Sequence, residues 1–256
     1  GYSEAQFSDY QKLIDRIYPE KKLVVGYSLG WDVLCTVMQF LPFTLGMVLI
    51  VTLGDLFSGE ERTGMVPILR STKYGRVSLL KCKLGAAVTI TTVLWILFQL
   101  VMLLIIALTY TLRGATCTVL LFNGKPSIYG LNWLTYYLLQ CAYSYLGTLV
   151  FTLFICCLSS ILPLRLSMPL DLTITLLTGI PMNHFCYADQ AFDLLDKCRA
   201  MMPSQLMAAH PTLQVYQSYA FGNVIIQLPY VTAAAILIES GLLLWFLHCR
   251  EGEKAT

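Results

Sequence analysis

Two uncharged apolar runs constrain this chain more than any other feature. Residues 33–54 and residues 84–112 contain no charged side chain, and large aliphatic residues fill both runs. A helix that crosses the hydrocarbon core of a bilayer needs about 20 apolar residues, and backbone groups in lipid have to be satisfied within the segment. Transmembrane strands have ~10 residues of alternating polarity, which these runs lack. The sequence therefore predicts an all-α, polytopic bundle of transmembrane helices.

The charge content agrees with this class. Only 12% of the residues are charged, whereas a soluble globular chain has about 25%. So few charges cannot cover a water-facing surface, so the lipid membrane is the expected surrounding. The basic residues are few and lie mostly near span ends, which argues against nucleic acid as a partner.

Five segments are apolar enough to be predicted as spans within one domain, 1–256. They are residues 33–54, 84–112, 130–161, 167–184 and 223–249. The segments 1–32 and 185–222 are polar by comparison. Within 185–222, Ala191–Met202 has the spacing of an amphipathic helix, which we expect Pro203 to end.

The charged segment 55–83, here called the island, sets the predicted orientation. Six of its nine ionic residues are basic: Arg62, Arg70, Lys73, Arg76, Lys81 and Lys83. Because basic residues collect in cytoplasmic loops, the island is expected in the cytoplasm. Residues 1–32 and 185–222 then lie outside. A cytoplasmic N-terminus would need one more span before Gly1, which would make six.

The order of residues in the island predicts a short helix followed by a turn. Phe57, Glu60 and Gly64 fall one helical turn apart, and a turn at Ser71-Thr72 precedes the next span. Acids at the front suit a helix N-terminus, and bases at the back suit lipid phosphates. A plain amphipathic loop held inside by its charge is the alternative.

The island also carries a recognisable pattern. It runs F-x-x-E-x-x-x-G from Phe57 to Gly64, then Ile68-Leu69, Ser71-Thr72, Gly75-Arg76 and Lys83. This pattern resembles the ABC-2 class of ABC transporter permeases, most closely the branch common in Gram-positive bacteria. The topology of nearly the whole chain fits that family, whereas the specific motif covers only residues 57–83.

The resemblance implies that the island is a coupling helix that docks on a separate ATPase subunit. Phe57 would fill an apolar pocket there, Glu60 and Glu61 would pair with bases, and Gly64 would allow close approach. The implied ATPase-coupling residues are Phe57, Glu60, Glu61, Arg62, Gly64 and Leu69. The residues expected at the basic membrane surface are Arg70, Lys73, Arg76, Lys81 and Lys83.

The family further implies an exporter of a hydrophobic or amphipathic substrate, such as a peptide or a drug, in a bacterial plasma membrane. Its partners are ABC ATPase subunits and a second permease chain, identical or different. This chain would be no enzyme and would bind no cofactor, with ATP and Mg²⁺ on the ATPase. In agreement, Gly124-Lys125 precedes Pro126 and belongs to no phosphate-binding loop.

Two acids, Asp171 and Glu239, lie inside predicted spans. Acids in a membrane are costly and face protein or water. They indicate either a substrate or proton path or a protonated, hydrogen-bonded helix contact; for Asp171, an ion pair with Arg165 is a third interpretation. Two rival functions stay open: a stand-alone membrane enzyme or sensor, and an ion-coupled transporter that uses Glu239.

No metal site is predicted. His184, Cys186, Cys198 and His210 have the spacing of no common zinc pattern. A Cys186–Cys198 disulfide stays open, since an outside loop would face an oxidising environment.

Overall fold

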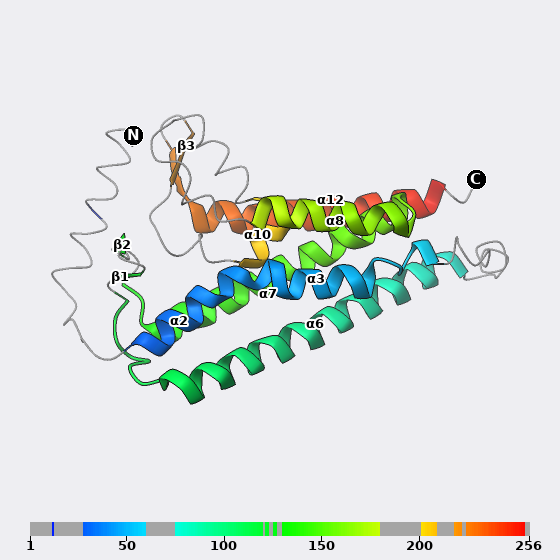
Figure 1. Ribbon diagram of the computed structural model, residues 1–256. Coiled ribbons are helices and arrows are strands. Elements are labelled where there is room, and N and C mark those ends of the chain that lie inside the picture. Colours follow the sequence, from blue (N-terminus) through cyan, green and yellow to red (C-terminus); the bar gives the residue numbers. More distant parts are fainter. Residues whose placement is uncertain are drawn as a thin grey trace.

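The computed structural model is an elongated bundle of helices (Figure 1). It describes residue 12 and residues 28–59, 75–119, 121–122, 125–126, 130–179, 201–208, 218–221 and 224–253. Most of these residues are helical, as predicted. Strands in the described residues form two short antiparallel hairpins, β1 (Leu121–Phe122) with β2 (Lys125–Pro126) and β3 (Ser218–Phe221) with β4 (Val224–Gln227).

The first membrane-length helix is continuous but changes its winding at its centre. It consists of α2 (Leu29–Val37), the 3₁₀ turn η1 (Met38–Phe40) and α3 (Leu41–Leu53). Pro42 lies in the first turn of α3 and has no N–H group to donate to the preceding turn. Its ring crowds the preceding turn, which accounts for the tighter winding there.

Three further helices are long enough to cross a bilayer. They are α6 (Gly75–Tyr110), α7 (Trp133–Ile161) and α12 (Leu228–Glu253). Among the described residues, four candidate spans result: Leu29–Leu53, Leu79–Tyr110, Trp133–Ile161 and Leu228–Arg250. Each overlaps one predicted span, so four of the predicted spans have a membrane-length helix.

The fourth predicted span, 167–184, has a shorter counterpart. Helix α8 (Leu164–Gly179) has 16 residues and contains Pro169. At 1.5 Å per residue it is about 24 Å long, which is less than the ~30 Å hydrocarbon core. Residues 180–184 lie outside the described part. The predicted count of five spans is therefore not confirmed.

The long helices bring four chain segments to one end of the bundle. Helix α3 ends, α6 begins, and α7 and α12 end at the right of Figure 1. The hairpins β1–β2 and β3–β4 lie at the opposite end. The borders of the island, the loop before α8 and the end of α12 with Arg250 thus share one end, as the distribution of basic residues predicts.

A short helix, α10 (Pro203–Ala208), lies inside the bundle rather than on its surface. It packs against the middle of α7, where a Cβ at Gly147 would overlap the Leu206 carbonyl. Leu206 and Met207 are buried. Pro203 begins this helix, and proline suits the first helical position; the predicted helix Ala191–Met202 before it stays a prediction. Residues 191–200 lie outside the described part.

The apolar core of the described residues has one large centre and two smaller ones. The large one joins α3, α6, α7, α10 and α12 around Leu49, Phe151 and Met207. One smaller centre lies at the hairpin end around Trp31 and Trp133. The other joins α7, α10 and α12 and is formed by Val150, Leu206 and Ile236.

Candidate functional site

A tightly held turn, Gly54–Gly59, follows α3 and begins the island. Two other helices contact this turn: α6 through Lys83 and the end of α7 through Ser159. The end of α12 joins them through Arg250, which contacts α7 at the neighbouring Ser160. We call these residues together the junction. Among the described residues, the junction contains contacts of both ends of the predicted coupling element, residues 55–59 and Lys83.

Ser159 of α7 holds the turn by three hydrogen bonds. Its hydroxyl donates to the Gly54 carbonyl at 2.7 Å and accepts from the backbone N–H groups of Phe57 and Ser58 at 3.3 and 3.4 Å. The carbonyl at a helix end and the first N–H groups after it have no helical partner. One buried hydroxyl therefore satisfies three groups and ties the end of α3 to α7.

Ser58 completes this network from within the turn. Its hydroxyl lies 3.3 Å from the Gly54 carbonyl and 3.1 Å from Asp55 Oδ1. Ser58 is buried, and buried polar groups in native structures are hydrogen-bonded. The turn is thus fixed by defined bonds and not by apolar packing alone.

Phe57 packs inside this chain. Its side chain is 7% exposed and belongs to the large apolar core. The ammonium group of Lys83 lies 4.6 Å from the centre of its ring, a distance at which a cation is attracted to the ring face. A ring with so little exposed surface is not available, in this conformation, for the expected docking into an ATPase pocket.

The end of α12 is tied to the same place. The Nε–H group of Arg250 donates to the Ser160 carbonyl at 3.0 Å, and lone carbonyls at a helix C-terminus favour a cation. Four helices therefore meet at the junction through specific contacts.

The other predicted residues of the island are placed only in part. Of the residues predicted at the basic membrane surface, Lys81 is exposed on α6 and Arg76 lies in its first turn. The remaining predicted residues of the island lie outside the described residues: Glu60, Glu61, Arg62, Gly64, Leu69, Arg70 and Lys73. The docking role of the first five and the lipid-facing role of Arg70 and Lys73 stay predictions.

The two intramembrane acids have different surroundings. Asp171 of α8 is fully buried, and among the described residues neither of its carboxyl oxygens has a hydrogen-bond partner. Arg165 is exposed, so the ion pair between these residues is absent. Glu239 of α12 is half-buried, and its Oε2 also lacks a partner in the described part of the chain.

Helix α7 carries a stripe of buried polar residues that the sequence-based predictions do not include. Gln140, Ser144, Thr148 and Thr152 recur every four residues and are fully or almost fully buried. Trp95 Nε1 donates to Ser144 Oγ at 3.3 Å, and the Thr91 and Thr152 hydroxyls lie 2.8 Å apart. The spacing of four within an apolar run was the available signal, because it places all four on one helix face.

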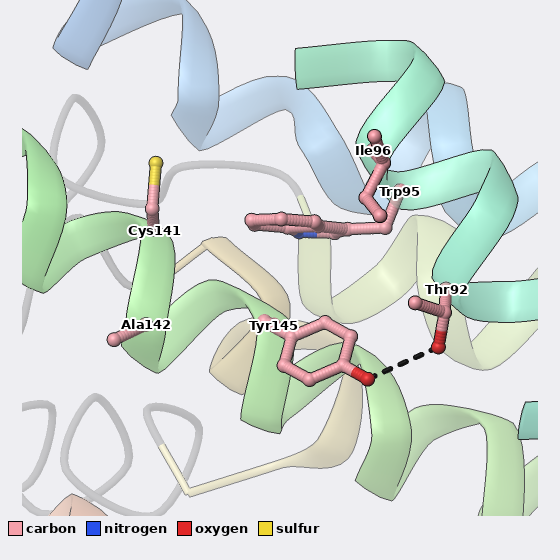
Figure 2. A pocket seen from close by; sticks show the side chains of 6 residues that line it. All are labelled: Thr92, Trp95, Ile96, Cys141, Ala142 and Tyr145. Carbon is pink, nitrogen blue, oxygen red and sulfur yellow. Dashed lines mark hydrogen bonds between the residues drawn. The ribbon is translucent and has the colours of Figure 1, made fainter. Parts of the chain in front are cut away.

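An apolar groove opens beside this stripe, between α6 and α7. Figure 2 shows its lining and the Tyr145 hydroxyl directed at Thr92, 3.0 Å away. The groove has a volume of ≈ 300 Å³. The rings of Trp95 and Tyr145 lie 5.2 Å apart. Trp95 is midway along the candidate span Leu79–Tyr110, so the groove opens at the middle of that helix and not at its end.

The open Cys186–Cys198 disulfide and the expected absence of a zinc site are not tested. Cys186, Cys198, His184 and His210 lie outside the described residues. The seven described cysteines are free. The described residues contain no group of three or more potential metal ligands.

Comparison with known proteins adds no relative. No protein-family model, no curated protein and no solved structure matches this chain. What the structure itself supports is a helical membrane protein with four candidate spans.

Proposed function

We propose that this chain is the permease subunit of an ATP-driven ABC exporter. In this proposal α8 is a fifth span, the junction end faces the cytoplasm, and the island docks on a separate ATPase subunit. A second permease chain, identical or different, completes the path. The membrane is the plasma membrane of a bacterium.

The observation that carries the proposal is the convergence of four helices on the junction. The island leaves from a turn bonded to α7 through Ser159 and returns on α6, whose Lys83 lies on Phe57 of that turn. The end of α12 bonds to the neighbouring Ser160. A force applied to the island therefore reaches α3, α6, α7 and α12 together. A transport subunit that is driven by a separate cytoplasmic ATPase requires such a connection.

The substrate class rests on the groove between α6 and α7. Its polar side-chain atoms bond to one another or to α7: the Thr92 and Tyr145 hydroxyls pair, and Trp95 Nε1 bonds to Ser144. The surface left to a ligand is apolar and lies at the middle of the candidate span Leu79–Tyr110. This lining favours a hydrophobic group, or the hydrophobic part of an amphipathic molecule.

The test is charge reversal in the island. Glu60→Lys and Glu61→Lys should abolish ATP-dependent transport in proteoliposomes, or prevent co-purification with the ATPase, because acids that pair with bases would become repulsive. Glu253→Lys, a reversal at the end of α12 on the same side, is the matched control and should keep both. If both island variants assemble and transport normally, the coupling role is wrong. Transport driven by an ion gradient without any ATPase would favour the rival transporter.

A further inference from the structure

Asp171 occupies a defined position between α8 and α3. The two helices run antiparallel: a Cβ at Gly54 would lie 3.1 Å from Met168 Cγ, and one at Gly46 would lie 3.7 Å from Thr175 Cγ2. Asp171 lies between these two contact points, and its exposed fraction is 0%. Interpolated between them, it stands about one helical turn inside the end of α3 that carries the junction.

The carboxyl group finds no hydrogen-bond donor there. Among the described residues, neither Oδ1 nor Oδ2 has a partner. Two buried hydroxyl residues, Ser167 and Thr175, lie four residues from Asp171 on the same helix face. The Thr175 hydroxyl donates to the main-chain carbonyl of Asp171 at 2.8 Å. Cys156 of α7 lies within electrostatic range of Asp171, and it is buried in the large apolar core.

The described helices around Asp171 place no cation against it. Helices α3, α7 and α10 contain no charged residue. On α6, Lys83 lies over the ring of Phe57 and is within electrostatic range of Cys156, as Asp171 is. On α12, Arg250 bonds to the Ser160 carbonyl. On α8 itself, Arg165 is exposed.

An ionised carboxylate in such a place is expensive. A buried charge without a partner costs far more than a buried neutral group, and the group neutralises instead. At 0% exposure the carboxyl also offers no surface that a larger cation could reach. We propose that Asp171 is a proton-binding site, and that α8 packs against α3 and α7 with a proton on this carboxyl group.

The consequence is a link between helix packing and protons. When α8 separates from α3, Asp171 meets water and releases its proton; when the helices close, it takes one up. This link is independent of any ATPase. It therefore holds or fails separately from the function proposed above.

Infrared spectroscopy of the purified chain in lipid nanodiscs tests the protonation state directly. At neutral pH the wild type should show a protonated-carboxyl C=O band that Asp171→Asn removes. Asp32→Asn and Glu239→Gln, which change two half-buried acids that each have a buried oxygen without a hydrogen-bond partner among the described residues, should keep this band. If the spectrum of Asp171→Asn keeps every protonated-carboxyl band of the wild type, the proposal is overturned. If that variant fails to fold, pH titration of the wild-type band decides in the same way.

Thermal unfolding in detergent tests the link to packing. Above about pH 4 an unfolded aspartate is ionised, so the folded chain would hold one proton more than the unfolded chain. Its unfolding equilibrium constant should then rise tenfold per pH unit until Asp171 ionises in the folded state. In a Glu239→Gln background, Asp171→Asn should remove this dependence. Identical pH profiles with and without Asp171 would refute the link.

Discussion

Ser159→Ala is the sharpest test of the junction. The substitution removes the hydroxyl that bonds to Gly54 at 2.7 Å and to the N–H groups of Phe57 and Ser58 at 3.3 and 3.4 Å. The short bond is worth about 1 kcal/mol. The Gly54 carbonyl keeps Ser58 as a donor at 3.3 Å, but the two buried N–H groups lose their acceptor.

We assign these two long bonds about 1 kcal/mol together, so the expected loss of unfolding free energy is about 2 kcal/mol. For a chain of this size that corresponds to a drop in Tm on the order of 4–8 °C. The assay is thermal unfolding of the detergent-solubilised protein, followed by size-exclusion chromatography of the heated samples.

Ser160→Ala is the matched control. The Ser160 hydroxyl bonds within its own helix, to the Cys157 carbonyl at 2.7 Å, and the Arg250 bond uses the main-chain carbonyl, which the variant keeps. Its loss should cost about 0.5 kcal/mol. If the two variants lower Tm equally, Ser159 does not act as the tie between α3 and α7, and the reasoning about the junction fails.

Three further predictions concern other contacts of the bundle. Gly147→Val should displace α10 and cost about 1–3 kcal/mol in thermal unfolding, whereas Gly85→Val, with no atom within 4 Å of the added Cβ, should be near neutral; equal losses would contradict the close packing of α10. Thr91→Val and Thr152→Val should couple by about 0.6 kcal/mol in a double-mutant cycle of unfolding, as hydrogen bonds between membrane helices do on average, and strictly additive losses would mean that the 2.8 Å contact contributes nothing. Lys83→Met should destabilise the fold by about 0.5–1 kcal/mol through its lost contact with the Phe57 ring, while Lys81→Met, an exposed position, should leave Tm unchanged; no difference between them would argue against that contact.

Much of the fold could be predicted because lipid imposes a strong local rule. An uninterrupted apolar run has one stable conformation in a bilayer, a helix. The run 130–161 therefore corresponds closely to α7, Trp133–Ile161. The run 167–184 was harder, because Pro169 and Asp171 interrupt it, and helix α8 is described over only 16 residues.

The candidate site was predicted less well. The island's charges predict one shared end for its borders and for Arg250 near the end of α12, and these segments lie at one end of the bundle. They gave no means to tell whether Phe57 projects from the chain or packs within it. The position of the Phe57 ring depends on Ser159 of α7 and Lys83 of α6. Both residues are distant from Phe57 in sequence, so no local sequence pattern predicts these contacts.

The sequence by itself determined the class of this protein, since its apolar runs and scarce charges leave membrane-spanning helices as the stable arrangement for most of the chain. Only the tertiary structure decided where its polar groups lie. Gly147 admits α10 to the middle of the bundle, Ser159 closes the turn after α3, and the Asp171 carboxyl is buried without a hydrogen-bond partner among the described residues. The physical reason is that hydrophobicity acts residue by residue, whereas hydrogen bonds and desolvation depend on which distant segments meet.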